Sequence, residues 1–454
     1  MATLAIVGAG FCGTMVATHV LRLSPGSIDR IVLVERTGPE VGGVAYGTPS
    51  TSHTLNVPAG RMSAFEDDPD DFLRHVRAHD RALTGGSFVP RHLYGEYLGR
   101  SLAEAERSSG VRLIRVAGEA VDVEEHADGA RLTLSDGRLV NAAHCVLAVG
   151  NYPPSDPPAA GEGLYASLRY ARDPWAADAL ERVREEPVLL LGSGLTMCDI
   201  VLALRDDDQQ APIVAISRRG LLPQAHRLSA KPPPHLDPPD DVDVWEPTAL
   251  GMLRALRGEV RRAEESGIDW REVVTSIRDA TPALWQRLAT DERRRFLRHA
   301  RPYWETHRHR SSPETAFAVE SMLESGALRL VRGTVRSYTE TPTGVLVRYA
   351  PRDGSDPELL GVGKVINCTG PDTDLARVRD PLIRALRERG AIRPDALGLG
   401  LDTHEDGRLI AADGAATRRL TLVGPLRKGR LWEHTAVPEL RVEARRVAER
   451  LCAV

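Results

Sequence analysis

The sequence predicts an α/β protein built from two similar units, because the same order of strand, glycine turn and helix occurs twice. In the first copy the apolar residues 4–7 are followed by Gly8, Gly10 and Gly13, spaced Gly-x-Gly-x-x-Gly, and by apolar residues at helical period. The second copy, PVLLLGSGLTMCDIVLAL, occupies residues 187–204. Segments in which apolar and polar residues alternate follow in each unit. The predicted fold is therefore two Rossmann-type dinucleotide-binding domains with small antiparallel meanders and a helical insertion.

Length and composition are those of a globular protein with more than one domain. The 454 residues are too many for one hydrophobic core, and 42% hydrophobic with 27% charged residues is typical of a soluble fold. A formal net charge of −4 gives no general case for binding nucleic acid or a membrane. No apolar run reaches the length of a membrane span, and the first strand leaves no room for a signal peptide. We therefore expect a cytoplasmic protein.

The first glycine turn predicts a site for the diphosphate of a dinucleotide. Gly8 lets the chain turn, Gly10 lets the backbone approach the diphosphate, and Gly13 lets the helix pack closely on the strand. The second strand, IVLVER at residues 31–36, ends at Glu35, an acid placed to accept hydrogen bonds from an adenosine ribose. The acid makes this interpretation stronger than a glycine turn without a ligand.

A loop rich in Gly, Pro, Ser and Thr follows at residues 41–63 and is expected to contain neither helix nor strand. Because it leaves a nucleotide-binding strand, it should run over the rest of the cofactor. Asn56 and Arg61 are its notable polar residues. A loop-stabilising hydrogen bond or a solvated charge is the alternative for each.

The remaining part of the first unit is predicted as two helices and a meander. Helices are expected within residues 67–83 and 91–110. Residues 111–150 alternate between apolar and polar side chains and contain turns at 128–129 and 136–137. They lead into a buried strand that ends at Gly150. Residues 328–370 repeat this pattern in the second unit and close at Gly370.

The second glycine turn differs from the first at two positions. Met197 replaces the third glycine, which should loosen the packing of helix on strand. Ser217, Arg218 and Arg219 stand where the first unit has its acid. Two guanidinium groups can pair with a 2′-phosphate, so this unit should prefer NADP over NAD. Two solvated surface arginines are the alternative.

Residues 221–326 belong to neither repeated pattern and are predicted as a helical insertion that covers the substrate site. A proline-rich loop at 231–247 precedes three helical patterns at 249–265, 270–288 and 291–304. The insertion ends in a basic cluster that could bind an anionic substrate or a cofactor phosphate: His307, Arg308, His309 and Arg310. A basic helix end that satisfies its own carbonyls is the alternative. With no Cys, Asp or Glu at ligand spacing, no metal site is expected.

The C-terminal segment is predicted as a strand that ends at Gly424 and a helix that begins near Pro438, with Thr435 as its N-cap. Its N-terminus would stabilise negative charge on a reduced flavin ring; the alternative is an ordinary capped helix. The five cysteines are widely scattered without a Cys-x-x-Cys pair, which argues against a dithiol reductase.

Taken together, these pieces resemble the flavoproteins with two dinucleotide-binding domains, which hold FAD in the first and NAD(P)H in the second. Within that superfamily the chain is similar to bacterial FAD/NAD(P)-binding proteins related to flavin-dependent, class B-like, N-hydroxylating monooxygenases. The resemblance is carried by GAGFCG, GVAYGTPSTSHTLNVPAGRM, GSGLTMCD, HRHRSSP and GPLRKGRLWEHTAVPELR. The Phe-x-Gly-x-x-x-His-x-x-x-Trp fingerprint of Baeyer-Villiger enzymes and its N-hydroxylase counterpart are absent between the units, where ASLRYARDPW stands.

The resemblance implies a set of cofactor-binding residues. FAD would be held by Gly8, Gly10, Gly13, Glu35, Gly150 and the Gly424 segment, and NADPH by Gly192, Gly194, Thr196, Arg218 and Arg219. The wider predicted set adds Phe11, Cys12, Arg36, Tyr46, Asn56, Val57, Arg61, Met62, Ser193, Leu195, Gly370, Pro425, Trp432, Glu433, Thr435 and Ala436. Asn56 falls at a position like that of an asparagine that lies beside the flavin in related monooxygenases.

The sequence therefore predicts an NADPH-dependent flavin monooxygenase, in which reduced FAD activates oxygen as a flavin peroxide and oxygenates a small substrate. The preferred subtype is N-hydroxylation of an amine or amino acid whose carboxylate meets the basic cluster at 307–310. An NAD(P)H oxidase or reductase and a non-catalytic flavin-binding redox sensor are the alternatives. Residues 1–150 and 371–454 would form the FAD-binding domain and 151–370 the NAD(P)-binding domain, with the insertion at 221–326. The oligomeric state is left open.

Overall fold

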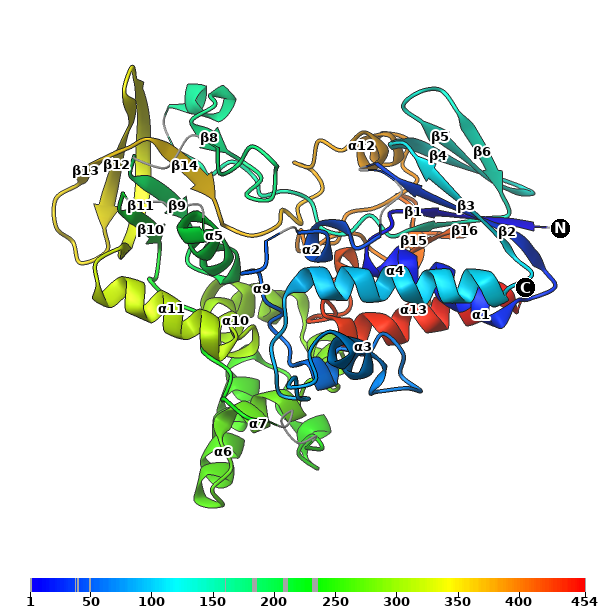
Figure 1. Cartoon of the computed structure of the whole chain (residues 1–454), viewed down its shortest axis with the longest axis horizontal. Coiled ribbons are helices and arrows are strands. Elements are labelled where there is room, and N and C mark those ends of the chain that lie inside the picture. The colour runs from blue at the N-terminus through cyan, green and yellow to red at the C-terminus, as the bar shows by residue number, and fades with distance from the viewer. Residues whose placement is uncertain are drawn as a thin grey trace.

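The computed structural model describes residues 2–36, 38, 41–48, 50–159, 161–181, 186–206, 211–230 and 236–453. Two sheets lie side by side, and the helices of the insertion lie below them (Figure 1). Residues 231–235, at the start of the predicted proline-rich loop, lie outside the described residues. No described helix is both long and apolar enough to cross a membrane.

The first sheet has six strands in the order β15-β16-β7-β1-β2-β3. All neighbours are parallel except β15 and β16. The bounds are β1 Ala2–Val7, β2 Ile28–Glu35, β3 Arg112–Ala117, β7 His144–Leu147, β15 Arg408–Ile410 and β16 Ala416–Leu422. The last two strands bring the C-terminal part of the chain into the sheet that carries the first glycine turn.

The alternation of side chains along β1 divides the core of this unit into two layers. Leu4 and Ile6 point into a layer formed with α1 (Phe11–Leu23), α3 (Asp71–His79), α4 (Arg91–Ser108) and α13 (Val437–Cys452). Ala5 and Val7 point into the opposite layer, formed with the antiparallel sheet of β4 (Ala120–His126), β5 (Gly129–Leu134) and β6 (Leu139–Ala142) and with α12 (Pro381–Glu388). Figure 1 shows these two layers on opposite faces of the sheet.

The first meander is shorter than expected. Residues 112–117 form β3, which pairs in parallel with β2, so only the strands from β4 to β6 form the predicted meander. The exposed edge of β2 needs a partner for its backbone groups, and β3 supplies it. This long-range pairing could not be recognised from the alternation of residues alone.

The second sheet has seven strands in the order β13-β12-β11-β10-β9-β14-β8. The bounds are β8 Tyr170–Ala171, β9 Val188–Leu191, β10 Ile213–Ser217, β11 Leu328–Thr341, β12 Gly344–Pro351, β13 Glu358–Val362 and β14 Lys364–Asn367. The start of β11 pairs in parallel with β10, and its continuation pairs antiparallel with β12. The second meander is therefore an extension of the main sheet.

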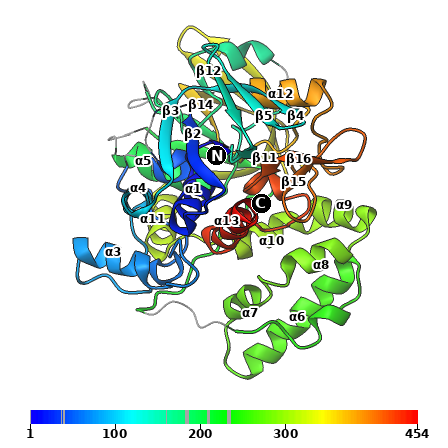
Figure 2. The same ribbon diagram turned by 90° about the vertical axis from the view of Figure 1, so that its right-hand side faces the viewer.

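The insertion contains more helices than the sequence pattern predicted. Its helices are α6 Ala249–Glu265, α7 Trp270–Ser276, α8 Thr281–Arg287, α9 Thr290–His299 and α10 Arg301–Arg308. The predicted helix at 270–288 is broken before Pro282 and the one at 291–304 before Pro302, because a proline is tolerated in the first turn of a helix but not in its interior. Figure 2 shows α6, α7 and α8 gathered in a lobe.

A further helix in this region was not expected. Residues Pro313–Glu324 form α11, with the Ser312 hydroxyl accepting a hydrogen bond from the amide of Thr315 at 3.1 Å. The helix packs against α5 (Leu195–Asp206) and β11, and so lies on the second sheet rather than with the lobe. The connection from β10 to β11 thus passes through the insertion before it reaches its crossover helix.

The C-terminal helix begins close to the predicted position, but its predicted N-cap is one residue too early. Ala436 is the N-cap of α13, it is extended, and it makes no side-chain cap hydrogen bond. Thr435 therefore does not cap this helix, although Pro438 does lie in its first turn as expected.

Candidate cofactor and substrate site

The two glycine turns are built in the same way. Gly8 and Gly192 have φ of +103° and +109°, which L side chains rarely adopt. A Cβ on Gly8 would lie 2.4 Å from the main-chain oxygen of Ala148, and one on Gly192 would lie 2.5 Å from that of Cys368. Each turn is thus pressed against the end of the corresponding buried strand, β7 or β14. The predicted duplication is confirmed at the level of individual contacts.

The second glycine of each turn faces open space. A Cβ on Gly10 or on Gly194 would meet no atom within 4 Å. Gly10 has φ −67° as the N-cap of α1, so its backbone does not require glycine; the free space beside the helix amides is the distinguishing feature. That space is what the diphosphate of a dinucleotide needs, so both turns fit such a cofactor. Phe11 and Cys12, and Leu195 and Thr196, begin the two helices.

The third glycine position is the one at which the two turns differ in residue type. A Cβ on Gly13 would lie 1.9 Å from the main-chain oxygen of Gly8. Met197 occupies this position in the second unit and is completely buried. The predicted loosening of helix on strand in the second unit stays a prediction.

Glu35 lies at the end of β2, directly beside the first turn. Its Oε2 accepts a hydrogen bond from the amide of Ala9 at 2.7 Å, so the carboxylate is held where the ribose of a bound dinucleotide is expected. Arg36 follows on the surface and pairs with Asp380 at 3.5 Å. Glu35 as a ribose ligand stays a prediction.

The corresponding end of β10 carries hydroxyl and guanidinium groups. The Ser193 hydroxyl donates to Ser217 Oγ at 2.8 Å and lies 2.6 Å from the main-chain oxygen of Leu221. Arg218 is exposed, while Arg219 is half-buried and contacts the main-chain oxygen of Arg298 at 3.4 Å. The two arginines thus directly follow Ser217, which contacts the second turn, and their pairing with a 2′-phosphate stays a prediction.

The loop at 41–63 is more ordered than predicted, since it contains the one-turn helix α2 (Gly43–Tyr46) and a 3₁₀ turn at Ala59–Arg61. It does return to the glycine turn: the amide of Gly42 donates to the main-chain oxygen of Ala9 at 3.1 Å. Burial raises the pKa of Tyr46, whose ring lies 4.6 Å from that of Tyr94. Val57 is half-buried against the core and Met62 is buried within it.

Asn56 marks the place where the two units meet. Its main-chain oxygen is 3.0 Å from Nε2 of His226, which comes from the segment after β10. Burial, followed by the nearby charge of Arg310, lowers the pKa of His226 to about 3, so the ring is neutral at neutral pH and donates this hydrogen bond. Nearby, Arg91 on α4 pairs with Asp199 on α5 at 2.8 Å. The chain after the second nucleotide strand is therefore fastened to the predicted flavin loop.

Arg61 belongs to a group of cations that sequence inspection missed. Burial and the charges of Arg278 and Arg441 lower the pKa of Arg61. Arg278, in the turn between α7 and α8, pairs with Glu439 at 2.6 Å, and Arg441 on α13 donates to the main-chain oxygen of Ser63 at 2.9 Å. Arg61, Arg278 and Arg441, here called the basic triad, come from three distant parts of the sequence. No motif connected them.

The Gly424 segment lies against the first helix; its role in flavin binding stays a prediction. Gly424 has φ +109°, and a Cβ there would lie 3.2 Å from Sγ of Cys12. Pro425 then opens a 3₁₀ turn. Further along, Trp432 is buried and its ring stacks on that of Trp285 with centroids 4.7 Å apart. Trp432 therefore faces the insertion rather than an exposed cofactor surface.

Glu433 makes polar contacts between the same C-terminal segment and the insertion. Its Oε1 accepts a hydrogen bond from the indole of Trp304 at 3.0 Å, and its Oε2 is 3.1 Å from His309 and 3.6 Å from Arg308. Burial alone would raise the pKa of Glu433, but these cations and Lys428 hold it well below its usual range. Its φ of +71° is unusual for a residue with a side chain, so the surrounding contacts hold strained backbone.

The predicted substrate cluster at 307–310 is therefore occupied by internal contacts. Arg308 and His309 pair with Glu433, and Arg310 is buried with its guanidinium 2.9 Å from the hydroxyl of Thr275. Only His307 of the four is exposed, and its Nδ1 is 2.8 Å from the main-chain oxygen of Tyr303. The partner carboxylate lies more than a hundred residues away in sequence, so this pairing could not be anticipated.

The cysteines show no dithiol. All five are free, and four of them are buried. Burial raises the pKa of Cys145 and of Cys198 to about 12. Thiolate chemistry is therefore suppressed at these positions.

Comparison with known proteins agrees with this geometry. Residues 5–152 match the family described as FAD-NAD(P)-binding. The reduced form of ornithine hydroxylase from Pseudomonas aeruginosa has a TM-score of 0.66 at 16% identity, covering 100% of this chain and 99% of that one. The chain has the fold of the two-dinucleotide-binding-domain flavoproteins. L-lysine 6-monooxygenase from Pseudomonas syringae is similar too, with a TM-score of 0.66, 17% identity and 99% of both chains covered.

This flavoprotein fold also includes reductases. A bacillithiol disulfide reductase from Staphylococcus aureus has a TM-score of 0.58 at 12% identity, over 100% of this chain and 99% of that one. Among curated proteins, the dialkyldecalin synthase of Streptomyces rugosporus is 30% identical over 159 residues, or 33% of this chain and 32% of that protein. The chain thus matches about a third of that relative's length. The predicted fold is confirmed, and the match of residues 5–152 supports the predicted FAD/NAD(P)-binding character of the first unit.

Proposed function

We propose that the chain is an NADPH-dependent flavin monooxygenase that oxygenates a small amine or amino acid. Bound FAD would accept hydride from NADPH and supply oxygen activation. FAD is assigned to the turn at Gly8 and Gly10 and NADPH to the turn at Gly192 and Gly194. This assignment is supported by the acid beside the first turn and the two arginines beside the second.

The chain's own residues would bind and orient the two cofactors. The first amides of α1 and α5 face open space and can donate to the diphosphates. Glu35 can accept from ribose hydroxyl groups, whereas Arg218 and Arg219 can pair with a 2′-phosphate. The hydrogen bond from His226 to Asn56 joins the second unit to the flavin loop and would fix the relative position of the two cofactors.

One observation favours oxygenation over electron transfer to an external partner: the insertion is clamped onto the segment that leads from Gly424 into α13. The clamp consists of the buried stack of Trp285 on Trp432 and the ion pairs of Glu433 with Arg308 and His309. A covered site excludes water and so protects activated oxygen long enough for transfer to a substrate. An open site would suit a protein or dye acceptor better.

The basic triad is a further candidate for a substrate carboxylate beside the cluster at 307–310, because it gathers three guanidinium groups at the predicted flavin loop. Arg61 lies within that loop, Arg441 contacts its last residue, Ser63, and Arg278 pairs with Glu439. Two similar structures carry the names ornithine hydroxylase and L-lysine 6-monooxygenase, which supports an amino-acid substrate. Arg308 would not bind the substrate itself but would hold the carboxylate of Glu433 in place.

The test is to supply the FAD-loaded protein with NADPH, isotope-labelled oxygen, and ornithine, lysine and simple amines. A hydroxylated product that carries one labelled oxygen atom supports the proposal. Flavin bleaching by NADPH with all oxygen recovered as hydrogen peroxide, for every substrate, would instead establish an oxidase or reductase. Failure of NADPH to bleach the flavin would leave a flavin-binding redox sensor.

A matched pair of variants tests the clamp. Trp285→Ala should raise the fraction of NADPH oxidation that ends as hydrogen peroxide, because it opens the contact with Trp432. Trp245→Ala is the control, since this tryptophan is also buried but packs within the insertion. Equal leakage in both variants would remove the support that the clamp gives to the proposal.

A further inference from the structure

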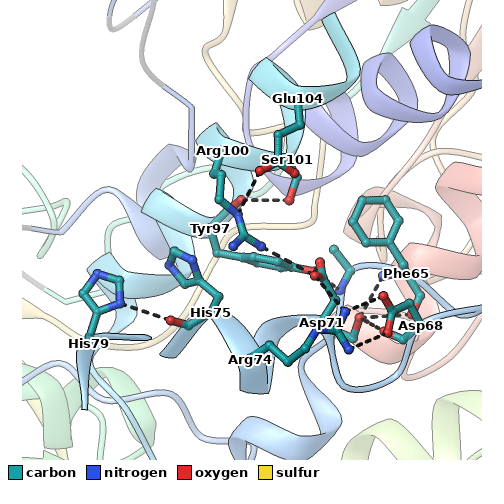
Figure 3. Close-up of polar contacts among 12 residues, drawn as sticks. Phe65, Asp68, Asp71, Arg74, His75, His79, Tyr97, Arg100, Ser101 and Glu104 are labelled. Atoms are coloured by element: carbon teal, nitrogen blue, oxygen red, sulfur yellow. Dashed lines mark hydrogen bonds and ion pairs between the residues drawn. The ribbon is translucent and has the colours of Figure 1, made fainter. Parts of the chain in front are cut away.

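Two histidines and a glutamate, side chains of types that bind metal ions, lie together on helices α3 and α4 of the first unit. His75 and His79 are one turn apart on α3, and Glu96 faces them from α4. One ligand atom from each of the three lies within 4.8 Å of the others. Nε2 of His79 is 3.4 Å from a carboxylate oxygen of Glu96. Figure 3 shows the two imidazole rings next to each other.

His75 is the unusual member of this group. It is only 7% exposed, and its buried Nε2 has no hydrogen-bond partner among the residues that the structure describes. A buried polar atom without a partner is rare in native proteins, and a missing ligand is one of its explanations.

The second histidine is oriented for the same task. Nδ1 of His79 is 3.2 Å from the main-chain oxygen of His75, as the dashed line in Figure 3 marks. This hydrogen bond fixes Nδ1 as the protonated nitrogen and leaves Nε2 as the lone-pair atom that faces Glu96. Metal-binding histidines commonly use their other ring nitrogen in this way.

We propose that His75, His79 and Glu96 bind a divalent transition-metal ion of the zinc class, with water completing the coordination. Two imidazoles and one carboxylate are ligands that Zn²⁺ accepts, and they suit Ca²⁺ or Mg²⁺ poorly. The ligand atoms must approach one another slightly, and the exposed side chains of His79 and Glu96 have the freedom to do so.

The contacts around the site indicate a structural role. The ring of His75 lies 5.5 Å from that of Tyr97 on α4, whose hydroxyl donates to Asp71 on α3 at 2.8 Å and accepts from the amide of Ala64 at 3.1 Å. Figure 3 shows this network beside the histidines. A metal would add a further connection between α3 and α4, which already share the contacts of Asp71 with Tyr97 and Arg100. It would thereby steady the chain around Ala64, two residues after the predicted flavin loop residue Met62.

The spacing His-x-x-x-His on a predicted helix was the available sequence signal. The third ligand, Glu96, comes from another helix, so the pair alone did not indicate a metal site. The expectation of no metal site was based on ligand spacing elsewhere, at the basic cluster at 307–310. The tertiary structure brings Glu96 to the pair.

The experiment is calorimetric titration of ZnCl₂ into the full, FAD-loaded chain after treatment with a chelator. We expect one tight site that His79→Ala and Glu96→Gln each weaken by at least about tenfold. Both side chains are exposed, so these variants should fold normally. His126→Ala is the matched control, because His126 also pairs with a glutamate, Glu124, at 3.9 Å on the surface but has no second histidine beside it.

The outcomes separate clearly. Weakened binding in His79→Ala and Glu96→Gln with unchanged binding in His126→Ala supports the site, as does a rise in melting temperature with ZnCl₂ that these two variants lose. Zinc binding that survives both substitutions, or no binding to the wild-type chain at about 100 µM Zn²⁺, overturns the proposal. Each readout is independent of the redox reaction.

Discussion

Replacing Gly10 by alanine should separate cofactor binding from folding. Gly10 adopts φ −67°, which alanine tolerates, and its Cβ would meet no protein atom within 4 Å. The folded state should therefore keep its stability, or gain about 0.4–1 kcal/mol, because alanine lowers the conformational entropy of the unfolded chain. The new methyl group would instead fill the space through which a diphosphate approaches the first amides of α1. Loss of one charge-assisted hydrogen bond, about 1.5–3 kcal/mol, corresponds to about 10- to 150-fold weaker FAD binding.

The assay is reconstitution of the flavin-free chain with FAD, followed by flavin fluorescence, with thermal unfolding as the check on folding. Gly194→Ala is the matched control, because its Cβ also meets no atom within 4 Å and it should weaken NADPH binding while FAD binding is retained. Gly13→Ala should destabilise the fold itself, since its Cβ would lie 1.9 Å from a main-chain oxygen. If Gly10→Ala binds FAD as tightly as wild type, the assignment of the first turn to FAD is wrong.

Three further predictions concern other parts of the site. Replacing Arg218 and Arg219 by alanine should raise the KM for NADPH and leave that for NADH nearly unchanged; equal changes would rule out 2′-phosphate recognition. The pKa of His226 is about 3 in the folded protein and near 6.5 in the unfolded chain, so folding favours the neutral ring. The contribution of His226 to the free energy of unfolding is therefore complete above pH 6.5 and is lost as the pH falls towards 3. Urea unfolding should show about 1.4 kcal/mol lost per pH unit in that window, and a smaller slope in His226→Asn; an unchanged slope would contradict the burial. Glu433→Gln should lower the free energy of unfolding in urea by about 3–5 kcal/mol, because it leaves buried cations without a carboxylate. The control Asp136→Asn, which removes an exposed ion pair, should change this free energy by no more than about 1 kcal/mol. Similar losses in both variants would refute the ionic clamp.

The local features of the fold could be predicted from the sequence. Each glycine turn depends on a few neighbouring residues, because the positive φ and the close main-chain oxygen at Gly8 and Gly192 exclude any residue with a Cβ. The same steric limits apply in both copies. The helix at Ala249–Glu265 was predicted at its observed bounds because its apolar period is continuous within one segment; the structure adds the N-cap at Thr248. Errors arose where a proline interrupted a continuous pattern, as at Pro282.

The candidate site was predictable only where its residues belong to a motif. Glu35 sits beside its turn because a strand of fixed length places it there. The basic cluster at 307–310 was predicted to bind an anionic group because of its charge, yet in the fold two of its members, Arg308 and His309, contact the carboxylate of Glu433.

The sequence by itself determined the two nucleotide-binding turns and the acid and arginine residues beside them, because these depend on neighbours a few residues apart. The tertiary structure alone decided which charges are paired, where the basic triad of Arg61, Arg278 and Arg441 assembles, and that Glu96 meets two histidines. Electrostatic and ligand interactions depend on distance in space, and chain folding sets that distance independently of separation along the sequence.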